Sequence, residues 1–297
     1  MISIVISSRS RLQLENVEKN IGETIGCIYE IIAIDNSKGE RGICAVYNEG
    51  ARIAKFSIVC FMHEDISFET TDWGLRVIEH LKNRQIGLIG VAGGDTKGWV
   101  PSSWSSSIFP SEVSLVQHFR NSMNEPERIV RTGYPENTEM AKRVACLDGV
   151  WMCTRKDVLA HFSFDEKNLK GFHGYDIDFS LQAGTRFDVC VVFDIMLHHF
   201  SEGSFNKDWV DAAILISDKW ASYLPFSVRN LKREEFVNQH WTSMRVFLKK
   251  QMDLRIPRLR VFKNLLKYSR TRYFHLFHFL HFCKLLVTYK ITQTDNS

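Results

Sequence analysis

The sequence predicts an α/β protein in which a mostly parallel central sheet is flanked by helices and followed by a basic helical appendage. Three observations predict this arrangement. Short apolar runs alternate with segments of helical periodicity over the first 95 residues, as in consecutive βαβ units. Two of these runs stop abruptly at polar side chains, and basic residues concentrate in the last quarter of the chain.

The elements follow one another in a regular order. Apolar runs predict strands at residues 2–7, 30–35, 57–62, 86–91, 144–153 and 189–193. Helical spacing predicts helices at residues 12–21, 43–55, 73–83, 155–161 and 208–224. A glycine-punctuated loop at 170–179 should enter a further helix, and the polar, aromatic segment 99–107 should be irregular.

Charge divides the chain into two expected domains. Residues 1–225 carry 23 Lys and Arg against 30 Asp and Glu, a net charge of −7. Residues 226–297 carry 15 against 4, a net charge of +11, and the two parts sum to +4. A basic tail points to an anionic partner. A membrane surface is favoured over nucleic acid, because no recognised nucleic-acid module accompanies the basic residues.

The positions of the cysteines and the lengths of the apolar runs indicate where in the cell the protein is expected. Cys60, Cys146, Cys153 and Cys190 lie in apolar runs, and we expect buried, reduced thiols. The first apolar run reads as a strand and not as a signal peptide. No run reaches the ~18 apolar residues of a membrane span. We therefore expect a cytoplasmic protein, with peripheral contact to the inner face of the cell membrane as an option.

Polar side chains stand where two of the predicted buried strands end. Asp35 and Asn36 close the second strand, and His63, Glu64 and Asp65 close the third. In open parallel sheets, ligands bind beyond the carboxyl ends of the strands, so we expect these groups to share one crevice. Carboxylates and an imidazole there suit a hard divalent cation and the diphosphate that it would neutralise.

The order of motifs along residues 1–205 resembles one known group of enzymes. The motifs are, in order, Ile34-Asp35-Asn36-Ser37, His63-Glu64-Asp65, Asp148-Gly149, Gly174-Tyr175-Asp176-Ile177-Asp178 and His198-His199. Together they resemble the inverting GT-A glycosyltransferases of glycosyltransferase family 2, above all bacterial members that add sugars to surface polysaccharides. The resemblance implies a Rossmann-like GT-A fold. It also implies an enzyme that moves one sugar from a nucleotide-diphosphate sugar, with UDP expected, to a glycan or lipid-linked acceptor.

The resemblance also implies roles for individual residues. Asp65 would ligate Mn²⁺ or Mg²⁺, with His63 and either His198 or His199 completing the metal shell. Asp176 would be the catalytic base, with Asp178 as the alternative. Asp35 would hold the nucleobase. The other expected donor contacts are Ser7, Ser8, Arg9, Asn36, Glu64, Asp148 and Gly149.

The chain departs from the family pattern at several motifs. His63 stands in place of the first Asp of D-x-D, and Tyr175 replaces the acidic residue before the base. Ser7-Ser8-Arg9 replaces a Pro-x-Tyr-Asn type of turn. The Q-x-x-R-W signature of processive synthases is absent, which favours transfer of a single sugar.

The residue types support this chemistry without the family. A divalent cation stabilises the charge that develops on a diphosphate leaving group. A carboxylate can take the proton of an acceptor hydroxyl. One such base implies a single displacement with inversion, by analogy with inverting glycoside hydrolysis.

Several candidates have a structural alternative. Asp35 is also a turn or helix-cap residue, Asp178 could cap the helix that follows it, and a histidine pair at a strand end is often structural. Trp151 and Tyr175 are candidate acceptor contacts, but core packing is favoured for Trp151.

Two tryptophans of the irregular segment, Trp99 and Trp104, are further candidate acceptor contacts. They would form a sugar or lipid platform, or simply pack onto the core.

The basic tail has a helical pattern over residues 258–282. A basic face carries Arg260, Lys263, Lys267 and Arg270, and another face carries Phe262, Leu265, Leu266, Tyr273, Leu276, Phe277 and Leu280. This is the pattern of a helix lying on anionic lipid, through residues 255–290. The alternative is a helix that packs on the catalytic domain or forms an oligomer contact.

Two other functions are compatible with this architecture. A sugar-1-phosphate nucleotidyltransferase would need a glycine-rich loop after the first strand, and residues 7–11 contain no glycine. A catalytically degenerate subunit that binds nucleotide or glycan would explain the departures at His63 and Tyr175.

Overall fold

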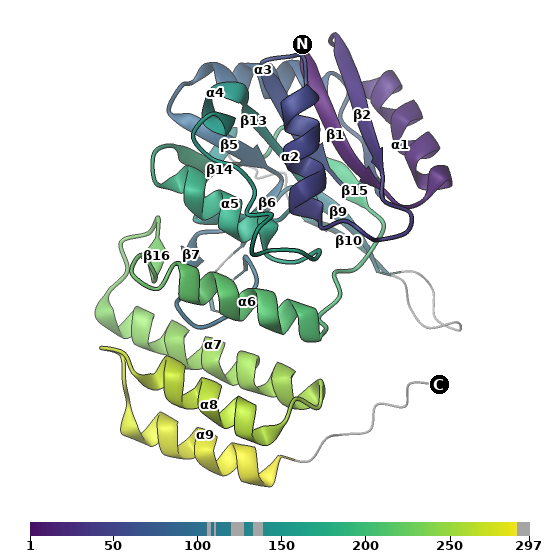
Figure 1. The fold of residues 1–297 in the computed structure, drawn as a ribbon. Coiled ribbons are helices and arrows are strands. Elements are labelled where there is room, and N and C mark those ends of the chain that lie inside the picture. Colours follow the sequence, from purple (N-terminus) through teal and green to yellow (C-terminus); the bar gives the residue numbers. More distant parts are fainter. Residues whose placement is uncertain (106–107, 110, 120–127, 133–138, 290–297) are drawn as a thin grey trace.

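The computed structural model describes residues 1–105, 108–109, 111–119, 128–132 and 139–289. Figure 1 shows an α/β body with a row of helices extending from it toward the C-terminus. The irregular segment 99–107, the tail 226–297 and the proposed membrane segment 255–290 each reach partly outside the described residues.

A seven-stranded sheet forms the centre of the body, in the order β11-β14-β5-β13-β3-β1-β2. Its strands are β1 (Ile2–Ser8), β2 (Tyr29–Asp35), β3 (Ile58–Met62), β5 (Ile86–Gly90), β11 (Ala141–Arg143), β13 (Trp151–Arg155) and β14 (Asp188–Val192). Pairing is parallel for β1 with β2, β1 with β3, and β14 with β5. It is antiparallel where β13 lies between β3 and β5, and where β11 joins β14. In the described chain, therefore, the sheet is mixed, although the strands from the predicted βαβ units share one direction.

Helices cover both faces of this sheet. On one face lie α1 (Arg11–Thr24) and α3 (Trp73–Lys82), and on the other lie α2 (Ile43–Ile53) and α5 (Tyr175–Gly184). Successive side chains of a strand point to opposite faces. Ile4 of β1 therefore packs in the core beneath α1 and α3, and Val5 packs in the core beneath α2 and α5. The strand is buried along its whole length, which explains its unbroken apolar sequence. A short helix, α4 (Lys156–Leu159), follows β13.

Smaller sheets complete the body. They join β10-β9-β15-β4, β12-β6-β8 and β16-β7, from β4 (Ile66–Phe68), β6 (Ala92–Gly94), β7 (Thr96–Lys97), β8 (Ser111–Val113), β9 (Leu115–Phe119), β10 (Arg128–Thr132), β12 (Cys146–Leu147), β15 (Leu197–His199) and β16 (Phe226–Ser227). The antiparallel pairing of β15 with β4 places His199 opposite Ile66. That register brings the late histidine pair beside the polar cluster that follows β3.

The predicted strand 144–153 is broken in the structure. Its two halves, β12 and β13, belong to different sheets, and Asp148 and Gly149 form the connection between them. A Cβ at Gly149 would lie 2.1 Å from the Tyr175 hydroxyl oxygen, so only glycine fits there. The break lies at this close approach of α5, which a run of apolar residues does not reveal.

Two of the four cysteines expected as reduced thiols form a disulfide. Cys60 on β3 and Cys153 on β13 are directly opposite each other and are joined. The expectation is wrong for this pair because β13 inserts beside β3, a neighbour separated by 93 residues in sequence. Cys146 and Cys190 are free and buried. The cysteines therefore do not support the expectation of a reducing compartment.

The C-terminal part is a row of helices with its own core. After α6 (Lys207–Lys219) come α7 (Arg233–Asp253), α8 (Arg258–Ser269) and α9 (Leu276–Thr288). Their shared core contains Trp241, Phe247, Leu265, Tyr268 and Phe282. The prediction of a single helix over 258–282 is wrong, because the chain turns between α8 and α9. Among the described helices, none combines the length and the apolar character that a membrane span requires.

Candidate functional site

A cavity of about 690 Å³ opens at the carboxyl ends of β1 and β3. Its walls come from the turns that follow these strands, the β12–β13 connection, the start of α5, the loop 201–206 and α6. It is lined by ten of the residues proposed from sequence: Ser7, Arg9, His63, Glu64, Asp65, Trp104, Asp148, Gly149, Tyr175 and Asp176. The crevice expected from the ends of the strands is therefore present.

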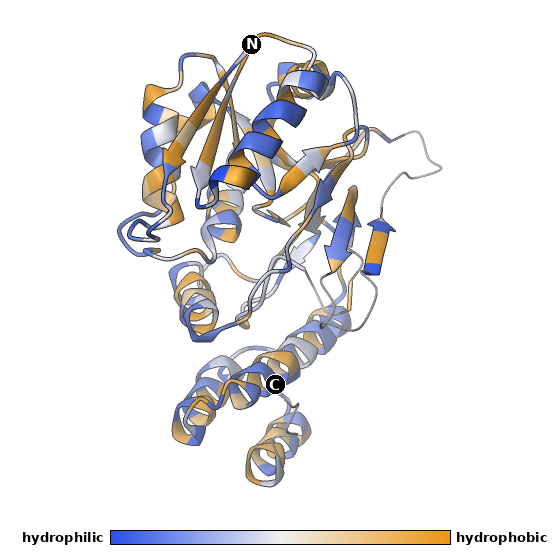
Figure 2. Cartoon of the chain, turned by 90° about the vertical axis from the view of Figure 1, so that its right-hand side faces the viewer, coloured by the Kyte–Doolittle hydropathy of each residue, from blue (hydrophilic) through white to orange (hydrophobic). Residues whose placement is uncertain are grey.

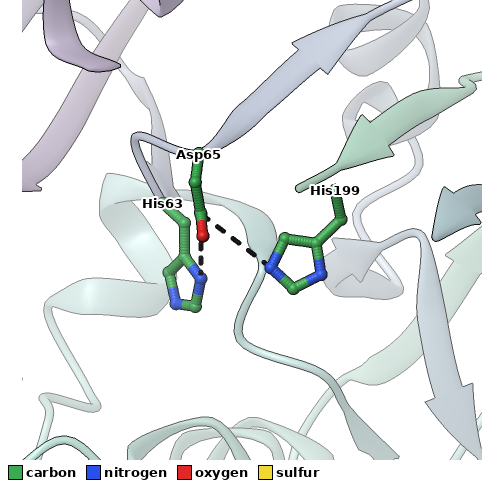
Figure 3. Close-up of side chains that lie close together, drawn as sticks. All are labelled: His63, Asp65 and His199. Carbon is green, nitrogen blue, oxygen red and sulfur yellow. Dashed lines mark ion pairs between the residues drawn. The ribbon is translucent and has the colours of Figure 1, made fainter. Parts of the chain in front are cut away.

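His63, Asp65 and His199 converge beside this cavity (Figure 3). His63 Nδ1 and His199 Nε2 each lie 3.8 Å from Asp65 Oδ1. Two ligands at about 2.1 Å from one metal ion stand roughly 3 to 4 Å apart, so the three groups fit a divalent cation. His199 is not among the residues that line the cavity, and in Figure 3 it lies to the right of Asp65, on the side opposite His63.

The protonation of this cluster suits metal binding. Burial raises the pKa of Asp65, but the neighbouring His63 and His199 rings outweigh it and bring the pKa below its usual value. Burial lowers the pKa of His199, and the nearby His63 ring adds to this effect. These shifts favour an ionised Asp65 carboxylate and a neutral His199 ring, which are the forms that bind metals.

Tyr175 fixes which nitrogen of His63 carries the proton. The Tyr175 hydroxyl lies 3.1 Å from the buried carbonyl oxygen of Gly149 and 2.8 Å from His63 Nε2. A buried carbonyl left without a donor costs about 1–3 kcal/mol, so the single hydroxyl proton goes to Gly149. His63 Nε2 then donates to the hydroxyl oxygen, and the Nδ1 lone pair faces Asp65.

Gln117 on β9 fixes His199 in the same way. Its side-chain Nε2 donates to the backbone oxygens of His118, His199 and Ser201. Its Oε1 is thereby left to accept from His199 Nδ1 at 3.0 Å, and the Nε2 lone pair of that ring faces Asp65. Supporting hydrogen bonds of this kind orient the ligands of protein metal sites.

Asp176 in the first turn of α5 has the protonation behaviour of a general base. Its Oδ2 accepts a hydrogen bond from the Gly149 amide at 3.2 Å. Burial, followed by the negative charge of Asp148, raises the pKa of Asp176 to about 7. A carboxyl group with a pKa near neutrality can take a proton from a hydroxyl efficiently.

Asp178 and His198 do not line the cavity. Asp178 is fully buried and accepts from Trp220 Nε1 and Gln182 Nε2 at 2.8 Å each, while Lys219 pairs with it at 2.9 Å. Two residues along a helix turn the side chain by about 200°, which separates Asp178 from Asp176. His198 instead contacts His118 at 2.8 Å. The geometry therefore supports structural roles for both residues.

Two predicted donor contacts, Asp35 and Asn36, stand at the same edge of the sheet but outside the cavity lining. Asp35 is exposed, and its Oδ1 accepts from the Ser37 amide at 2.8 Å, which lowers its pKa. Asn36 is buried and bonds to the main chain of Arg41. These contacts match the turn alternative that the sequence left open.

Glu64 lines the cavity, but its carboxylate also holds the turn after β1. It accepts from Ser8 Oγ at 2.8 Å and from the amides of Arg9 and Ser10 at 2.9 Å each. Ser8 itself is not in the lining. Glu64 therefore positions the strand end that carries Ser7 into the cavity.

The proposed acceptor residues separate clearly. Trp151 is fully buried in the core against Phe68 and Trp73. The prediction that Trp151 contacts the acceptor is therefore wrong, and the core-packing alternative holds. Trp99 packs edge-on against Tyr268 of α8 and is absent from the cavity lining. Trp104 lines the cavity, and Tyr175 reaches it while supporting His63.

Sequence reasoning missed the wall formed by α2, the loop 201–206 and the start of α6. Tyr47, Asn206, Asp208 and Trp209 of this wall line the cavity, and His173 lines it from the loop before α5. Asn206 caps α6 by accepting from the Trp209 amide at 2.9 Å, and a cap is readable from sequence. The sequence gives no sign, however, that this cap faces the strand ends, because that depends on how α6 packs.

Comparison with known proteins identifies the family. The sequence model of the glycosyltransferase-like family matches residues 2–217. No curated protein matches the chain. Among solved structures, GalNAc-T7 crystallised with UDP, GalNAc and Mn²⁺ is similar, with a TM-score of 0.51 and 12% identity over 74% of this chain and 48% of that one. This chain thus spans about half the length of GalNAc-T7.

A second similar structure is S. aureus TarS 1–349, with a TM-score of 0.45 and 13% identity over 91% of this chain and 86% of that one. The family model covers most of the sequence, and the layered sheet with its cavity at the strand ends has the architecture of GT-A enzymes. The chain therefore belongs to the glycosyltransferase-like family and has the GT-A fold.

Proposed function

We propose that this protein transfers one sugar from a nucleotide-diphosphate sugar, with UDP as the nucleotide, to a hydroxyl group of a glycan or lipid-linked acceptor, with inversion at the anomeric carbon. The observation that carries this proposal is that His63, Asp65 and Asp176 line one cavity. A cation-type cluster and a carboxylate with a pKa of about 7 thus face the same space.

Different residues would bind the metal and accept the proton in such a transfer. A divalent ion, Mn²⁺ or Mg²⁺, held by His63, Asp65 and His199 would stabilise the charge that develops on the diphosphate. Asp176 would accept the proton of the attacking hydroxyl. Gly149 donates its amide to Asp176 Oδ2, which orients the carboxylate. One base and one displacement give inversion.

The acceptor is proposed to enter along the wall that α6 forms. Trp209 of α6 lines the cavity, and so do the aromatic residues Trp104, Phe172 and Phe205. Aromatic faces beside a few polar groups are suited to stacking on a sugar ring. We propose that the enzyme transfers a single sugar, as a step of polysaccharide synthesis.

A subunit that binds nucleotide without turning it over is the alternative. The replacement of the first Asp of D-x-D by His63 favours it, but His63 here supplies a lone pair to the Asp65 cluster. The turn after β1 contains no glycine, which disfavours a nucleotidyltransferase with a glycine-rich phosphate loop.

Calorimetric titration of UDP, GDP, dTDP and CMP, each with and without Mn²⁺, would test the proposal. We expect one nucleotide to bind tightly and only with the metal, and Asp65→Ala to lose this binding. His198→Ala is the matched control, since His198 contacts His118 and does not belong to the His63, Asp65 and His199 cluster. If no nucleotide binds in either condition, the proposal is wrong.

A further inference from the structure

The last helix of the described chain presents an apolar side to solvent. Leu276, Phe277, Leu280 and Val287 of α9 are 60%, 70%, 56% and 75% exposed. Residues 280 and 287 are seven apart and residues 276 and 280 are four apart, so they fall along one side of the helix. Phe282 and Leu286 on the opposite side are buried in the helical core. Helix α9 is therefore apolar on two opposite sides. Within the described chain, the side that carries Leu276, Leu280 and Val287 is not covered by protein.

Helix α8 also exposes apolar side chains. Leu259 is 66% exposed and Phe262 is 38% exposed, and α8 packs beside α9 (Figure 1). Figure 2 shows hydrophobic stretches interrupted by hydrophilic ones on these C-terminal helices. We call the six exposed apolar residues of α8 and α9 the tail face: Leu259, Phe262, Leu276, Phe277, Leu280 and Val287.

Basic residues greatly outnumber acidic ones in this part of the chain. Residues 226–289 hold 14 Lys and Arg against 3 Asp and Glu, a net charge of +11. Arg260 and Lys267 pair with Asp211 and Asp218 of α6, so that edge of α8 faces the body.

Lys263 and Arg270 are placed differently. At about 100° per residue they fall between the paired edge of α8 and Leu259, and both are exposed. On α9, Lys284 is exposed between Leu280 and Val287. Among the described residues, these three cations have no carboxylate partner. Unpaired cations therefore border the apolar residues directly.

We propose that the tail face docks on the surface of an anionic membrane. Apolar side chains that enter the headgroup boundary, flanked by Lys and Arg, are the features of helices that lie on membranes. Each basic residue near an anionic surface strengthens binding by about fivefold. A protein partner would more often meet such a face with few charges at its centre. This inference does not depend on the proposed sugar transfer, since docking needs neither donor nor metal.

The test is flotation of the full-length protein with vesicles, without nucleotide or metal. We expect binding to vesicles of phosphatidylglycerol mixed with phosphatidylcholine, and at least tenfold weaker binding to pure phosphatidylcholine or in high salt. The double variant Phe277→Ser/Leu280→Ser and the triple variant Lys263→Gln/Arg270→Gln/Lys284→Gln should each lose at least tenfold of the binding.

The matched control is Leu12→Ser/Ile53→Ser, which removes two equally exposed apolar side chains from the α/β body and should leave binding unchanged. The inference is overturned if the wild-type protein does not float with anionic vesicles. It is also overturned if light scattering shows a dimer that Phe277→Ser/Leu280→Ser converts to monomer without any change in vesicle binding. Circular dichroism of each variant confirms that it is folded.

Discussion

The α/β body and the C-terminal helical row both bury aromatic residues, but they differ in where their charged groups lie. In the body, ionisable side chains gather at one edge of the sheet, where burial and neighbours move the pKa values of Asp65, Asp176 and His199. In the helical row, Lys and Arg are spread over an exposed surface. Clustering with shifted pKa values is typical of catalysis, and dispersed charge is typical of attraction to a surface. Substitutions in the body should therefore change turnover, and those in the helical row should change stability or docking.

The largest effect on turnover is expected for Asp176→Asn. The amide cannot accept the hydroxyl proton, and loss of a general base typically costs about 10²- to 10⁴-fold in rate. In the wild-type enzyme the active form is the carboxylate, so turnover should rise with pH through about 7, the pKa of Asp176. A pH–rate profile measures this. Nucleotide binding that falls as steeply as turnover would contradict a role as base.

The same substitution should stabilise the protein above neutral pH. Because the pKa of Asp176 is raised from 3.8 to about 7 in the folded state, its neutral form favours folding. That contribution is fully present below pH 3.8 and is lost as the pH rises through 7. Asparagine cannot ionise, so Asp176→Asn should be more stable than wild type at pH 8, by roughly 2 to 4 kcal/mol. Urea unfolding at pH 8 and pH 4 tests the sign, and the gain should shrink at pH 4.

The next effect separates two neighbouring histidines. His199→Ala removes a group 3.8 Å from Asp65 and should weaken Mn²⁺ binding by roughly a hundredfold or more, since even supporting residues are worth about 10- to 100-fold. His198→Ala, on the other side of β15, should change it by less than about threefold. Titration of Mn²⁺ by calorimetry compares them. If both variants lose the same Mn²⁺ affinity, the substitutions disturb strand β15 as a whole, and His199 is not a metal ligand.

A smaller effect is expected for Tyr175→Phe. The ring still packs against Tyr47 and Phe164, but His63 Nε2 loses its acceptor and Gly149 its donor. Mn²⁺ affinity should fall by about tenfold. Imidazole NMR should show both tautomers of His63 in the variant and one in the wild type. An unchanged spectrum would contradict the assignment of Tyr175 as the residue that orients His63.

The same contrast explains what the sequence could predict. Buried parallel strands end at one edge, so Asp65 and the glycine-punctuated start of α5 could be located from the residue pattern alone. The choice between Asp176 and Asp178, or His198 and His199, could not. Each pair differs only in the face on which a side chain emerges, and that is decided by packing against Trp220 or Gln117.

Long-range strand order was equally hidden from the sequence. The insertion of β13 between β3 and β5 created the Cys60–Cys153 disulfide and buried Trp151. In the tail, helical periodicity predicted amphipathic character but not the turn between α8 and α9, because both helices continue the same mixture of aromatic and basic residues.

The smallest effect on turnover is expected from the core of the helical row, where stability alone should change. Phe282 is 1% exposed and stacks with Trp241, so Phe282→Ala should lower the free energy of unfolding of this part by about 3 to 5 kcal/mol. Phe277→Ala removes an exposed ring from the same helix and should change it by less than about 0.5 kcal/mol. Thermal unfolding measures both variants, and turnover is assayed well below the transition. If Phe282→Ala abolishes turnover while the protein is still folded, the helical row shapes the cavity through α6. The division between a catalytic body and a docking row would then fail.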